Sequence, residues 1–147
     1  MAGISLKVKN MKQFESRLKS QDRGVHRNVV GVINNIAVNI RNTAVKSILQ
    51  NARAGGDSTR YNPKRTIRVS KAGDPPASDT GYLASQIVVK IDADQLGADI
   101  ISNADYSEAL EFGTLTMGAR PFMQPAAEDS RKKYEQKLTK AIKDSLK

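Results

Sequence analysis

The chain contains no cysteine and only one histidine among its 147 residues. Without cysteine, neither disulfide bonds nor thiolate metal sites can form. The single histidine, His26, has no second histidine to complete a metal site, and a Ser–His–Asp arrangement is unsupported. No glycine-rich phosphate loop precedes a Lys-Ser/Thr pair, and the aspartates between residues 92 and 105 do not follow calcium-loop spacing. We therefore expect no enzyme, no catalytic residues, no cofactor and no metal.

Long apolar runs are also missing. No stretch approaches the ~20 apolar residues of a membrane span, and the N-terminus lacks the apolar run of a signal peptide. We expect a soluble protein with no membrane partner. The length of 147 residues predicts a single domain over residues 1–147. Such a domain buries about two-thirds of its unfolded surface, so its core needs no covalent staples.

Acidic residues are scarce in the first half of the chain. Residues 1–73 hold 15 Lys and Arg against 3 Asp and Glu, a formal charge of +12. Residues 74–147 hold 9 against 12, a charge of −3, and the whole chain carries +9. A basic half of this kind indicates contact with a polyanion or with an acidic protein surface.

Hydrophobic periodicity predicts the N-terminal elements. Alternation over Ile4–Lys9 predicts a strand, and residues 10–18 a short helix. From Asp22, a suitable N-cap, to about Asn51, apolar residues recur every three or four positions, which predicts a long amphipathic helix. Its apolar stripe comprises Val25, Val29, Val32 or Ile33, Ile36, Ile40, Ala44 and Ile48.

The second half predicts a hairpin and short helices. Ser78–Gly81 can cap a single helical turn, and β-rich runs at 86–91 and 98–102 flank a glycine-containing turn. Residues 106–112 predict a short helix closed by Gly113, and residues 125–146 a last helix with Glu128 and Asp129 near its positive end. The predicted class is α+β: a small antiparallel sheet packed against a long helix of the N-terminal half and a C-terminal helix.

The segment between the long helix and this second half, residues 53–77, has little apolar content. Only residues 66–69 favour a strand, so we predict a flexible basic loop. It is either a solvated loop or a surface that meets DNA phosphates or an acidic partner. The basic residues concerned are Arg53, Arg60, Lys64, Arg65, Arg68 and Lys71.

A set of motifs follows in a characteristic order. Gly73–Pro76 leads into Asp79–Leu83; Tyr106-Ser107 precedes Leu110–Thr114; and Arg120–Phe122 precedes Pro125-Ala126. Together these motifs resemble the neck proteins of long-tailed bacteriophages, called head–tail joining, tail-completion or tail-terminator proteins, and more remotely the minor tail protein Z group. The resemblance covers about residues 73–130; the basic segment before residue 73 is not included.

The resemblance implies a structural protein of the virion neck, assembled in the host cytoplasm. It implies a homo-oligomeric ring, expected to be a hexamer, around the channel through which DNA passes. The expected partners are further copies of the chain, a tail tube protein and a head connector or stopper protein. As hypothesis, the assembly interface uses Pro75, Pro76, Tyr82, Phe112, Arg120, Pro121, Phe122 and Met123. The alternative is that these residues only fold the monomer.

Two other functions compete with this one. The basic half and residues 53–71 suit a sequence-independent nucleic-acid binder, although Tyr61 alone is a poor base-stacking platform. An enzyme of the virion, such as a wall hydrolase, would need acid–base residues in a cleft. Glu108 and Glu111 are one helical turn apart, but we interpret them as surface charge.

Overall fold

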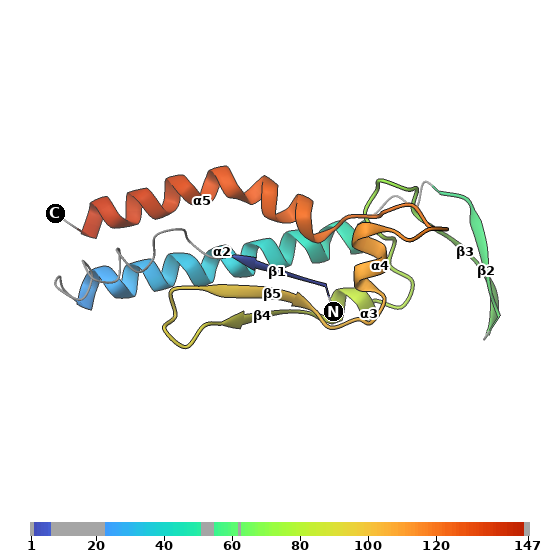
Figure 1. The fold of residues 1–147 in the computed structure, drawn as a ribbon, viewed down its shortest axis with the longest axis horizontal. Coiled ribbons are helices and arrows are strands. Elements are labelled where there is room, and N and C mark those ends of the chain that lie inside the picture. The colour runs from blue at the N-terminus through green and yellow to red at the C-terminus, as the bar shows by residue number, and fades with distance from the viewer. Residues whose placement is uncertain (1, 7–22, 51–54, 62, 146–147) are drawn as a thin grey trace.

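The computed structural model describes residues 2–6, 23–50, 55–61 and 63–145, and has an α+β fold (Figure 1). A three-stranded antiparallel sheet has the order β1 (Ala2–Leu6), β5 (Ala98–Ser102), β4 (Ile87–Ile91). The long helix α2 (Arg23–Leu49) lies between this sheet and the C-terminal helix α5 (Met123–Ser145). The predicted α+β class is confirmed, with α5 packed on α2.

The apolar stripe of α2 supplies much of the core. Seven of its residues are buried at helical spacing: Val25, Val29, Ile33, Ala37, Ile40, Ala44 and Ile48. All but Ala37 belong to the stripe predicted from the sequence, while Ile36 is only partly buried. Burial on two sides outweighs the weak helix propensity of the β-branched residues. The predicted cap Asp22 and the predicted helix 10–18 lie outside the described residues.

The sheet positions the rest of the chain against α2. The predicted hairpin of residues 86–91 and 98–102 is confirmed, with Ile87 opposite Ser102 and Ile91 opposite Ala98. The N-terminal strand, described over Ala2–Leu6, includes the start of the predicted strand Ile4–Lys9 and pairs with β5, while residues 7–9 of that prediction lie outside the described residues. The guanidinium Nε of Arg41 on α2 donates to the carbonyl of Ile87 at 3.0 Å, which fixes the start of β4 on the helix.

A second sheet corrects the prediction for residues 53–77. β2 (Asp57–Tyr61) pairs with β3 (Lys64–Arg68) as an antiparallel hairpin that projects from one end of the body (Figure 1). The predicted strand at 66–69 overlaps only β3. The ladder continues to the body through Gly55, whose N–H donates to the carbonyl of Val69 at 2.9 Å. A Cβ on Gly55 would collide with that carbonyl.

The hairpin escaped prediction because its residues are polar. All five residues of β2 are exposed, so its sequence has no alternation of apolar and polar side chains. An isolated two-stranded hairpin is marginal in water. Contacts with the body must therefore hold it in place.

The same end carries α3 (Tyr82–Ser85) and α4 (Ser107–Phe112). The predicted closure of α4 is confirmed: Gly113 has φ of 78°, and its N–H donates to the carbonyl of Ala109 at 2.9 Å. Positive φ favours glycine, and a Cβ there would also press on the backbone at Met117 and Ala119.

Glu111 of α4 caps the start of α5. Its carboxylate is buried and accepts hydrogen bonds from the N–H groups of Phe122 at 2.9 Å, Met123 at 3.0 Å and Gln124 at 2.8 Å. Such groups have no acceptor within the helix, and a negative charge also suits this end of the helix dipole. The interpretation of Glu111 as surface charge is wrong. No acid lies in the first turn of α5, so Glu111 supplies the charge expected of Glu128 and Asp129.

Glu111→Ala should lower the free energy of unfolding by about 2–3 kcal/mol, because it leaves buried N–H donors without an acceptor. Glu111→Gln should cost less, since one amide oxygen still accepts. Urea denaturation at neutral pH measures both. Exposed Asp105→Ala, just before α4, is the control and should change stability by less than about 0.5 kcal/mol. Equal stability of Glu111→Ala and the wild type would contradict the capping role.

Candidate functional site

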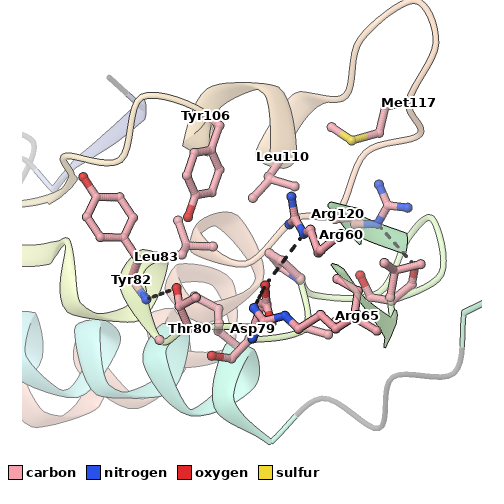
Figure 2. Close-up of a pocket in the computed structure, with 18 residues that line it drawn as sticks. Arg60, Arg65, Asp79, Thr80, Tyr82, Leu83, Tyr106, Leu110, Met117 and Arg120 are labelled. Atoms are coloured by element: carbon pink, nitrogen blue, oxygen red, sulfur yellow. Dashed lines mark hydrogen bonds and ion pairs between the residues drawn. The ribbon is translucent and has the colours of Figure 1, made fainter. Parts of the chain in front are cut away.

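A cleft opens where the β2–β3 hairpin leaves the body (Figure 2). Its volume is about 680 Å³. Apolar side chains from several elements line it, and polar groups stand at its sides. The apolar members are Ile48 of α2, Ile67 and Val69 at β3, Pro76 and Ala77 of the following loop, Leu83 of α3, Leu110 of α4, and Met117.

Two arginines of the hairpin face this cleft. Arg60 and Arg65 are directly opposite one another across β2 and β3, and like charges in that position repel. Asp79 neutralises part of this charge. Its two carboxylate oxygens each accept from Nη2 of Arg65 at 2.8 Å, and Nε of Arg60 lies 3.7 Å away. Asp79 thus ties the hairpin to the body. The predicted single turn is present as α3, but its N-cap position is Gly81, which offers no side-chain cap.

A third arginine, Arg120, adds positive charge at the cleft. Its Nε donates to the carbonyl of Ser70 and its Nη1 to the carbonyl of Gly118, both at 3.3 Å. Both acceptors are neutral, and among the residues that the structure describes Arg120 has no carboxylate within 4.0 Å. Three guanidinium groups and one carboxylate give the cleft lining a formal charge of +2.

Two tyrosines form an aromatic wall of the cleft. The rings of Tyr82 and Tyr106 have centroids 6.3 Å apart with a tilt of 36° (Figure 2). Both side chains remain about half exposed. Burial, assisted by the nearby Tyr82, raises the pKa of Tyr106 above its ordinary value, and the neighbouring Arg60 opposes that shift.

The predicted interface residues divide into surface and core. Tyr82 and Phe112 are exposed, at 50% and 70%. Pro75, Arg120 and Pro121 are half-buried, and Pro76 is buried. Phe122 and Met123 are each only 1% exposed and belong to the core, so their prediction as anchors for a partner is wrong. An apolar pair such as Phe122-Met123, close to Pro121 and Pro125, can lie in the core or in an interface, and the sequence alone does not distinguish the two.

The described basic residues of the predicted loop differ in their ionic contacts. Arg60 and Arg65 turn toward Asp79, while Lys64 and Lys71 are exposed. Arg53 and the side chain of Arg68 lie outside what the structure describes. Sequence interpretation missed three residues of this region: Asp79 as the anchor of the hairpin, Tyr106 in the wall of the cleft, and Leu115 as a fully exposed apolar residue. Only the unusual position of leucine in a polar turn signalled any of these.

Comparison with family models, with curated proteins and with solved structures found no match to this chain. Within the described ranges, no group of three or more His, Cys, Asp or Glu side chains is placed to hold a metal ion. No helix among those same residues combines the length and apolar character needed to cross a membrane.

Truncation of two phenylalanines of the motifs should change the free energy of unfolding to very different extents. Phe122→Ala should destabilise the protein by about 3–5 kcal/mol, because it removes a fully buried ring from the core. Phe112→Ala, at a 70% exposed position, should change stability by less than about 0.5 kcal/mol. Thermal and urea unfolding of both variants measure this contrast. Similar losses for the two variants would show that Phe112 is also part of the core.

Proposed function

We propose that this protein is a non-enzymatic structural component of the neck of a long-tailed phage. In this role it completes the tail and joins it to the DNA-filled head, as a ring of copies, expected to be six, around the DNA channel. Its partners there are a tail tube protein and a head connector or stopper protein. It would assemble in the host cytoplasm and reside in the virion.

The observation that carries this proposal is the mutual contact of the motifs that resemble the neck family. The N–H of Gly73 donates to the carbonyl of Ala119 at 2.7 Å, and the N–H of Arg120 to that of Leu110 at 2.6 Å. Glu111 binds the start of α5 at Phe122. Motifs far apart in the sequence therefore build one unit, as expected if they belong together as a family signature.

Exposed apolar residues at the same end of the molecule support an assembly role. Phe112 is 70% exposed and Leu115 fully so, and half-exposed Tyr82 lines the cleft. Exposed aromatic side chains are frequent anchors of protein–protein interfaces.

Electron microscopy of lysates tests the proposal. A phage that encodes this chain, with the gene disrupted, should yield filled heads beside free tails, because the joint between them cannot form. Normal tail length would indicate joining or completion, and irregular or excessive length would indicate termination. Expression of the wild-type chain in trans should restore joined particles. Intact infectious particles without the gene would refute the neck role.

Sequence-independent nucleic-acid binding is the second candidate. The exposed hairpin favours nucleic-acid binding. Tyr61 is 81% exposed, and exposed Lys64 lies directly opposite it on the same face of the β2–β3 ladder. If phosphate contacts drive binding, the purified protein should retain duplex DNA at low salt and lose it steeply as salt rises. Lys64→Glu should weaken that retention, with exposed Lys137→Glu on α5 as the control. Equal retention by both variants would exclude the hairpin as the DNA contact.

A further inference from the structure

We infer that α4 separates two complementary surfaces, and that copies associate when the outer face of α4 in one copy docks into the arginine-lined cleft of the next. This interface deepens the proposed ring and rests on it. The occupant of the cleft is therefore a second copy of this chain, and the contacting groups are a carboxylate, an aromatic ring and a leucine.

The turn of the helix places the two surfaces back to back. Successive helical residues are rotated by about 100°, so positions two apart face nearly opposite directions. Tyr106, at the N-cap of α4, and Leu110 line the cleft. Glu108 and Phe112 project from the other side and are exposed, while Glu111 faces the core.

The docking segment consists of the outer face of α4, with Glu108 and Phe112, and the exposed turn that follows it. Phe112 is 70% exposed, and Leu115 is fully exposed in the turn that follows α4. This turn is held by its own hydrogen bonds: the N–H of Thr114 donates to the carbonyl of Met117 at 2.8 Å, and Oγ1 of Thr114 accepts from the N–H of Met117 at 3.1 Å. A turn already ordered loses little entropy on docking.

The cleft offers the matching chemistry. Its formal charge of +2 suits one carboxylate, and of the three cleft arginines Arg120 is the one whose described acceptors are all neutral. Its apolar lining and the half-exposed Tyr82 and Tyr106 suit a phenylalanine or leucine. Charge complementarity therefore pairs Glu108 of one copy with Arg120 of the next. An apolar contact beside this pair would exclude water and strengthen it.

The symmetry of this contact leads to a ring. Because two different surfaces meet, the interface is heterologous, and repeated copies close into a ring when the rotation permits. Both surfaces belong to the end of the molecule that carries α3, α4 and the β2–β3 hairpin (Figure 1).

Cysteine cross-linking tests the contact directly, since the natural chain contains no cysteine. Leu115→Cys and Thr80→Cys, at an exposed position of the cleft lining, are purified separately and mixed under mild oxidation. We expect a disulfide-linked dimer in the mixture, well above the amount that either variant forms alone. Val38→Cys, exposed on α2, mixed with Thr80→Cys is the control and should give none. Failure of the Leu115–Thr80 pair to exceed this control would overturn the interface.

Charge reversal tests the ion pair. Glu108→Arg should weaken association at least about tenfold, as measured by light scattering across a dilution series. Adding Arg120→Glu to the same chain should restore it. Asp105→Arg, at an exposed acid nearby, should leave association unchanged. Arg120→Glu also loses donors to two backbone carbonyls, so far-UV circular dichroism first establishes that each variant is folded. If Arg120→Glu does not fold, Phe112→Asp replaces it and should abolish association.

Complementation separates failure of the interface from failure of the neck role. If wild type, Glu108→Arg and Phe112→Asp all restore joined particles to the gene-disrupted phage equally, the neck role stands and the interface is overturned. If wild type neither self-associates nor restores particles, both are overturned. If Arg120→Glu removes DNA binding but leaves association intact, the cleft is a phosphate site and the interface is again overturned.

Discussion

The buried carboxylate of Glu111 is the contact on which the functional end of this protein depends. It joins the last turn of α4 to the first N–H groups of α5, eleven to thirteen residues further along the chain. Because α5 packs along α2, this bond fixes α4 relative to the main body. The intervening segment is thereby closed at both ends, and it carries both exposed Leu115 and cleft-lining Arg120. An uncapped and buried helix start would instead cost several hydrogen bonds.

Elements set by local sequence patterns were predictable, whereas contacts between segments far apart in the sequence were not. The stripe of α2 and the β4–β5 hairpin were predicted because local periodicity encodes them. The β2–β3 hairpin was missed because it is polar and is held by Asp79 on another segment. Glu111 was taken for a surface acid because its partners are N–H groups, which no side-chain pattern reveals. Phe122 was placed in an interface because an apolar residue in an extended segment has no period to assign its side.

The basic character of the chain is divided among different tasks. Asp79 accepts from Nη2 of Arg65 at 2.8 Å and lies 3.7 Å from Nε of Arg60. Such arginines hold elements together and leave less charge for a polyanion than the +12 of residues 1–73 indicates. Arg120 differs, because neutral carbonyls orient its guanidinium without cancelling its charge. A net charge summed over a segment therefore overstates the positive charge that a partner meets. How much of it remains depends on which basic side chains have an acidic side chain beside them.

The pairing of β1 with β5 has a consequence for the order of folding. Ala2 pairs with Ser102, so the first strand meets its partner only across a loop of about one hundred residues. β4 and β5 are joined by a short turn and can pair early, since closing a long loop costs more chain entropy than closing a short one. On the ribosome, β1 emerges well before β5 exists. We therefore expect the edge of the sheet that β1 covers to be completed last, after α2 and the β4–β5 hairpin have built a surface to receive it.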